Sequence, residues 1–124
     1  MKETIIIITV LFLTFVPNFI FKNYLETSGS EIIDLVEVMK NELKNENSEN
    51  NYSKELENIF LDKEKKWIMF VDHEILDEIE NSIEECIAFY NAKDYMEFES
   101  SSNKLKSSIE DLRKREEISL SNIL

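Results

Sequence analysis

Glycine and proline, which build most tight turns, occur only once each in this chain of 124 residues, as Gly29 and Pro17. A β-sheet needs such residues at its hairpins, because hairpin turns require backbone conformations that few other residues adopt readily. Helices joined by polar connections have no such requirement. The composition therefore predicts an all-α fold, with a length that suits a single folded domain.

An apolar run near the N-terminus is the second constraint. Ile5–Val16 contains no charged or amide side chain, and the apolar character continues to Phe21. This stretch is at the short end of what crosses a bilayer as a helix. A cleaved signal peptide and a buried core helix are the alternatives. A signal peptide has small residues after its apolar core, and a core helix has a polar face; this stretch fits neither pattern well. We expect an uncleaved transmembrane helix in residues 1–27 that contacts the lipid bilayer through residues 5–21.

The flanks of this run say little about its orientation. Lys2 precedes it and Lys22 follows it, so the positive-inside rule barely separates the two directions. A short N-terminal flank usually stays inside, and the acidic region that follows does not oppose export. We therefore expect a single-pass protein of the cell membrane, with a cytoplasmic N-terminus and residues 28–124 outside.

The formal net charge of −12 lies entirely in the second part of the chain. Before Ser30 the charged residues are Lys2, Glu3, Lys22 and Glu26, which cancel. An acidic surface of this kind repels phosphate backbones, which excludes nucleic acid as a partner, and would also repel anionic lipid headgroups. It attracts basic partners and divalent cations, although a solvated acidic face is the commoner explanation.

Residues 28–124 contain four stretches in which apolar residues recur with the period of a helix. The stripes are Ile32, Val36, Met39 and Leu43; Leu56, Ile59, Phe60, Trp67 and Phe70; Ile75, Leu76, Ile79, Ile83, Cys86, Ile87 and Tyr90; and Phe98, Leu105, Ile109 and Leu112. The pattern predicts a small antiparallel bundle of three to four helices after the transmembrane helix. Three helices would result if the second and third stretches fused.

Local signals predict where these helices begin. Ser28 and Glu31 have the spacing of a capping box, with Gly29 at a hinge between anchor and bundle. The polar run 45–51 predicts a loop. Asp72 is a candidate N-cap of the third helix, and Asp94 of the fourth, where Glu97 completes a second capping box.

The stretch around His73 is the most suggestive candidate site. His73 and Asp77 are four residues apart and could face one side of a helix start, where Asp72 or Glu80 could join them around a metal ion. The structural interpretation is stronger: Asp72 caps the helix, and His73 forms a hydrogen bond to Asp77 or to a neighbouring helix. The chain offers no second histidine to complete a common metal site.

The sequence gives no support to an enzyme. Trp67 and Phe70 read as core or interface aromatics, and Cys86 as a small buried apolar residue. Along one helix Cys86 would lie about 20 Å from His73, too far for a nucleophile and its base. A single glycine cannot form a phosphate-binding loop, and no cofactor is expected.

Several of these residues also carry a resemblance, namely Trp67, Phe70, Asp72-His73-Glu74, Leu76-Asp77, Ile79 and Ser82, together with the ending Arg115–Leu124. The chain resembles an uncharacterised bacterial family, domain of unknown function 4363 (DUF4363). The family implies no activity, substrate or cofactor. Its association with genes for YetF-like multispan membrane proteins implies an accessory subunit of such a protein.

The function expected from the sequence is a membrane-anchored extracytoplasmic interaction module or accessory subunit of a membrane or envelope protein, without catalysis, for which a homo-oligomer stays open. The alternative is a cation-binding or sensory domain that uses the acidic face and His73. Trp67, Phe70, Asp72, His73 and Asp77 are the residues expected to serve structure or interaction.

Overall fold

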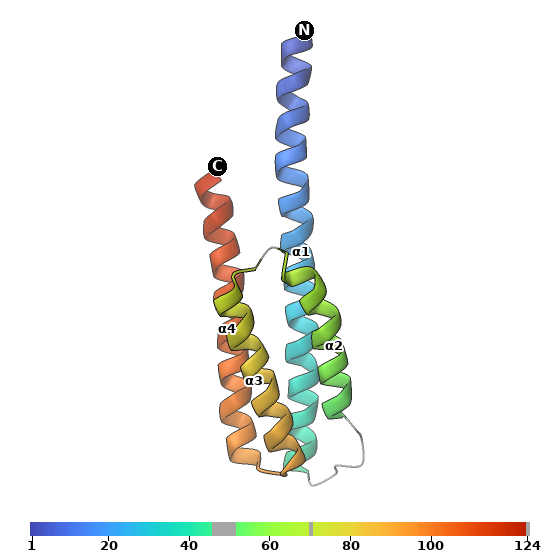
Figure 1. Cartoon of the computed structure of the whole chain (residues 1–124), viewed down its shortest axis with the longest axis vertical. Helices are drawn as coiled ribbons and strands as arrows, with labels where there is room; N and C mark the ends of the chain where they lie inside the picture. Colours follow the sequence, from blue (N-terminus) through green and yellow to red (C-terminus); the bar gives the residue numbers. More distant parts are fainter. Residues whose placement is uncertain (46–51, 70, 124) are drawn as a thin grey trace.

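A computed structural model describes the backbone of residues 1–45, 52–69 and 71–123, and the side chains of these residues apart from 17, 18 and 116–123. This part of the chain forms four helices and no strand: α1 (Lys2–Lys44), α2 (Tyr52–Trp67), α3 (His73–Asn91) and α4 (Tyr95–Ile123). Successive helices run in opposite directions and pack side by side as a bundle (Figure 1). The prediction of an all-helical chain is confirmed, in its four-helix form.

Helix α1 is continuous from Lys2 to Lys44, so the predicted hinge at Gly29 and helix start at Ser28 are wrong. Ser28 is buried within the helix, and its hydroxyl donates to the carbonyl of Tyr24 at 2.7 Å. A serine inside a helix commonly makes this bond to the preceding turn. The local capping signal is overridden here because the helix is held on both sides by packing.

Gly29 instead serves the close approach of α1 and α4. A β-carbon at this position would lie 2.9 Å from Cγ2 of Ile109 and 3.1 Å from Nη2 of Arg113. The same Arg113 nitrogen donates to the carbonyl of Glu26 at 3.1 Å and to the hydroxyl of Ser30 at 3.0 Å. A side chain larger than hydrogen would separate the two helices and strain these contacts.

The predicted caps of α3 and α4 are present. Asp72 is the N-cap of α3, and its Oδ1 accepts from the backbone N–H of Glu74 at 3.3 Å. At the start of α4, Asp94 Oδ1 accepts from the N–H of Glu97 at 3.2 Å. Each bond satisfies an amide that the helix itself leaves without a partner. The loop predicted for residues 45–51 lies outside the described residues except for Asn45.

The turn between α3 and α4 is tight enough to fix the two helices as an antiparallel pair. The N–H of Asp94 donates to the carbonyl of Phe89 at 3.0 Å, and that of Lys93 to Tyr90 at 3.1 Å. This is a Schellman ending, with Lys93 at φ 58 in the left-handed conformation that glycine usually takes. Asp94 therefore ends one helix and caps the next.

The core runs along the centre of the bundle and contains buried residues from all four predicted stripes, together with Leu25, Leu35 and Val71, which the stripes did not include. These are Leu25, Ile32, Leu35, Val36, Met39, Leu43, Leu56, Phe60, Trp67, Val71, Ile75, Leu76, Ile79, Ile83, Cys86, Tyr90, Phe98, Leu105, Ile109 and Leu112. Trp67 is 0 % exposed, and its Nε1 donates to Ser28 Oγ at 3.1 Å. The last residue of α2 is thereby tied to the middle of α1.

The reactivity of the single cysteine, Cys86, indicates whether the bundle is folded. Cys86 is a free thiol, buried among the α3 core residues. Burial, together with the nearby Glu85 carboxylate, raises the pKa of the Cys86 thiol to about 12. The reactive thiolate is thus scarce at neutral pH, and alkylation of Cys86 requires the bundle to open.

The contact between Trp67 and Ser28 gives a first prediction. Ser28→Ala leaves a buried indole N–H without its acceptor and should destabilise the bundle by about 1–3 kcal/mol. Trp67→Phe also destabilises, but the double variant should be more stable than the sum of the single effects predicts, by about 1 kcal/mol. Thermal protection of Cys86 from alkylation, measured on the full chain in detergent micelles, gives all of these values.

Ser102, a buried serine that forms no hydrogen bond to the Trp67 indole, serves as the control for this comparison of single and double variants. Ser102 is 0 % exposed, and its hydroxyl donates to the carbonyl of Glu99 at 2.8 Å. Ser102→Ala should combine additively with Trp67→Phe. Additivity for Ser28→Ala as well would show that the bond to Trp67 contributes nothing.

The glycine contact gives a second prediction. Gly29→Val should lower the stability of the bundle by about 1–3 kcal/mol through overpacking against Ile109, although valine is the better helix former. Thr27→Val is the matched control, because Thr27 is exposed on the same helix and its replacement should change stability by less than about 0.5 kcal/mol. Equal effects of the two substitutions in the Cys86 protection assay would contradict the close approach.

Candidate functional site

The N-terminal half of α1 projects beyond α2 and α3, and the C-terminal end of α4 extends past them on the same side over a shorter length (Figure 1). Its large apolar side chains are 49 to 65 % exposed, namely Ile5, Ile6, Ile7, Ile8, Val10, Leu11, Phe12, Leu13, Phe19 and Ile20. The most apolar 18-residue window of α1 has a mean hydropathy of 2.4, and none of it is buried by the rest of the molecule. Among the described residues, α1 is the one helix that is long and apolar enough to cross a membrane.

The second half of the same helix belongs to the core. From Phe21 onward side chains of α1 pack against the bundle, and Leu25, Ile32 and Met39 are buried. Tyr24 lies at the transition, with Lys66 Nζ 4.9 Å and Lys63 Nζ 5.7 Å from the centre of its ring. The apolar segment and the bundle are therefore joined by continuous helix rather than by a linker.

His73 and Asp77 are not joined by a hydrogen bond in the described part of the molecule. Both side chains are exposed at the start of α3, and none of the hydrogen bonds or ion pairs between described residues involves His73. The expected bond between His73 and Asp77 is absent there. Nor do the described residues contain a group of three or more histidine, cysteine, aspartate or glutamate side chains that could hold a metal ion.

The other residues expected around this position have separate places. Asp72 caps α3, and its Oδ2 lies 4.0 Å from Nη1 of Arg115 in α4, an exposed and therefore weak ion pair. Trp67 is a core residue rather than a surface aromatic. Phe70 lies outside the described residues.

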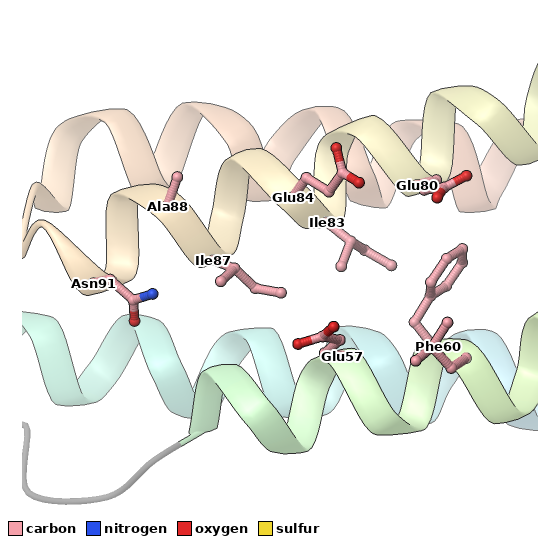
Figure 2. A pocket seen from close by; sticks show the side chains of 9 residues that line it. Glu57, Phe60, Glu80, Ile83, Glu84, Ile87, Ala88 and Asn91 are labelled. Atoms are coloured by element: carbon pink, nitrogen blue, oxygen red, sulfur yellow. The ribbon is translucent and has the colours of Figure 1, made fainter.

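A groove between α2 and α3 has a volume of ≈ 430 Å³. Figure 2 shows side chains from both helices turned toward it. Phe60, Ile83 and Ile87 form its floor, and Leu61, 48 % exposed, forms part of its wall. The remaining lining residues are Glu57, Glu80, Glu84, Ala88 and Asn91, so the groove is lined by three carboxylates and by no lysine or arginine.

Glu80, one of the lining carboxylates, is repelled by neighbouring acidic side chains. The pKa of Glu80 is raised above its usual value by partial burial, and further by the charges of Glu64, Glu84 and Asp77. A positive charge placed in the groove would lower this repulsion. The site therefore combines an apolar floor with an electrostatic preference for cations.

Sequence reasoning missed this groove, although a signal for it exists. Ile83 and Ile87 were assigned to the core stripe of the third helix, but Ile87 is only half-buried. Leu61 falls outside the stripe of its helix, and Glu80 and Glu84 recur at the same four-residue interval as the two isoleucines. An apolar residue outside the core stripe, such as Leu61, is the signal that could have been noticed. Only the packing of α2 against α3 shows that a hollow lies there.

Comparison with known proteins identifies one family. The profile described as Domain of unknown function (DUF4363) matches residues 19–123, which span all four helices and begin near the end of the apolar run. No curated protein and no solved structure matches the chain. The match covers well over half of the sequence, and it confirms the resemblance carried by Trp67, the Asp72-His73-Glu74 triplet and the C-terminal residues. The chain belongs to the family of the domain of unknown function DUF4363.

Proposed function

We propose that this protein is a single-pass, membrane-anchored helical module that binds another membrane or envelope protein and has no catalytic activity of its own. The observation that carries the proposal is the division of α1 into an exposed apolar half and a half buried in the bundle. Exposing so large an apolar surface to water is unfavourable, whereas a bilayer accommodates it. In this proposal residues 5–21 contact the bilayer, and α1 enters the bundle from Phe21 onward.

The proposed orientation places the N-terminus in the cytoplasm and the bundle outside. Lys2 then lies on the cytoplasmic side of the apolar run, and Lys22 with the acidic bundle lies on the outer side. The continuous α1 helix supports a bundle held at a fixed height above the membrane. A partner that lies in or on the same membrane would then meet a fixed set of surfaces.

The groove between α2 and α3 is the proposed binding surface for a protein partner. Its lining along α3 extends from Glu80 to Asn91, about 16 Å of helix, which matches roughly three turns of a partner helix. A helix satisfies its own backbone hydrogen bonds and can offer an apolar stripe to the floor. Lysine or arginine beside that stripe would meet Glu57, Glu80 and Glu84. The proposed partner segment is therefore a cationic amphipathic helix.

Membrane anchorage gives the third prediction. The full chain should stay in the membrane pellet after carbonate extraction, because its apolar half of α1 has no other place to be buried. In intact protoplasts, protease added outside should cut the bundle while leaving the apolar segment protected. A shortened chain released into the medium would identify residues 1–21 as a cleaved signal and contradict the proposed membrane anchor.

The groove gives the fourth prediction. In crosslinking from native membranes, Glu57→Lys/Glu84→Lys should lose the partner captured by the parent chain, with at least a roughly tenfold weaker yield, because like charges then meet across the groove. Both side chains are exposed, so the bundle should remain folded. Glu78→Lys/Glu110→Lys makes the same change in net charge on exposed positions outside the groove and should retain capture. Equal loss in both variants would assign the effect to overall charge.

A further inference from the structure

The end of the bundle from which the apolar half of α1 leaves has features of its own. We call it the anchor end and define it as residues 22–29, 62–69, 71–76 and 110–115. The connection between α2 and α3 lies there, whereas the turn between α3 and α4 lies at the opposite end (Figure 1). On this connection Ile68 and Met69 are 48 % and 73 % exposed. Two adjacent large apolar side chains are thus exposed at the anchor end.

Contacts to α1 fix the height of this connection. Trp67, which precedes it, donates to Ser28, and Lys66 lies over the ring of Tyr24. From Ser28 to Phe21, where the apolar run ends, α1 rises about 10 Å, and from Tyr24 only about 5 Å. The headgroup layer on one side of a bilayer is roughly 5–7 Å thick. If α1 spans the membrane, as proposed above, Ile68 and Met69 lie at the depth of the lipid headgroups.

The basic residues of the chain are concentrated at the anchor end. Seven of the chain's 14 basic residues belong to the anchor end: Lys22, Lys63, Lys65, Lys66, Arg113, Lys114 and Arg115. Seven acidic residues of the anchor end match them in number, Glu26, Asp62, Glu64, Asp72, Glu74, Glu110 and Asp111, and Glu116 and Glu117 follow next on α4. Residues 30–61 and 77–109 contain 16 acidic against six basic residues, a net charge of −10. The repulsion from anionic lipid expected for the whole acidic segment therefore belongs to the part that lies farther from the anchor.

We infer that the anchor end of the bundle rests on the phospholipid headgroup layer, with Ile68 and Met69 inserted at the interface and the exposed Lys65 and Lys114 reaching lipid phosphates. Apolar side chains flanked by lysine are typical of surfaces that lie in this layer, because the apolar groups enter the acyl boundary while the amines stay with the phosphates. The inference rests on the proposed membrane anchorage and adds to it a second contact. It fixes the tilt of the bundle as well as its distance from the bilayer.

The test uses the full chain in nanodiscs of phosphatidylcholine and phosphatidylglycerol in equal parts. A fluorophore is attached at Met69→Cys, and quenching by lipids that carry a nitroxide near the headgroup is measured. The parent chain, whose Cys86 is buried, provides the unlabelled blank. Met96→Cys is the matched control, because Met96 is 79 % exposed on the first turn of α4 at the opposite end. Position 69 should be quenched by about half and position 96 hardly at all.

A charge reversal separates lipid contact from mere proximity. Lys65→Glu/Lys114→Glu should reduce quenching at position 69, since the anchor end then repels the phosphates. Lys44→Glu/Lys54→Glu makes the same change of net charge with exposed lysines of the far end and should leave quenching unchanged. Loss of quenching in both variants, or in neither, would overturn the inference.

Two further outcomes distinguish this inference from the anchorage on which it rests. A chain that leaves the nanodiscs at high salt would show that α1 is not an anchor, and both proposals would fall. A chain that remains with the nanodiscs while position 69 stays unquenched would leave the anchor intact and overturn the headgroup contact alone. A blue-shifted but unquenched label at position 69 would likewise overturn it, because it would show that the label is buried against protein rather than lipid.

Discussion

The buried hydrogen bond from Trp67 Nε1 to Ser28 Oγ sets the register on which the rest of the structure depends. It joins the last residue of α2 to the middle of α1 within the core, where a polar group without a partner would be costly. Ser28 in turn donates to the carbonyl of Tyr24. The Ser28 hydroxyl therefore connects the last turn of α2 with two neighbouring turns of α1. Sliding α2 by one turn would break this contact and expose the indole.

That register links the features of the anchor end with those along the rest of the bundle. It places Ile68 and Met69 beside the end of the apolar run, and it sets which residues of α2 face α3 across the groove. Gly29 acts on the other side of α1, where it lets α4 approach and Arg113 reach the backbone of Glu26. A continuous helix held from both sides transmits the position of the apolar segment directly to the bundle.

The two proposed surfaces differ in chemistry as their proposed partners do. The groove offers carboxylates around an apolar floor and suits a cationic helix, whereas the anchor end offers lysines around two apolar side chains and suits phospholipid. They lie on different parts of the bundle, so a protein partner and the membrane can be engaged at once. This arrangement is what a tethered accessory subunit requires.

Much of the fold was determined by the sequence alone, because the relevant signals act over a few residues. The period of the apolar stripes defined the helices, and the short side chains of Asp72 and Asp94 defined two of their starts, since each bonds an amide only two or three positions away. The tertiary structure decided the rest. Ser28 and Gly29 carry a local capping pattern, but partners 39 and 80 or more positions away make them interior to a helix. The groove, the exposed Leu61 and the height of Ile68 and Met69 likewise depend on how whole helices meet, which local patterns do not encode.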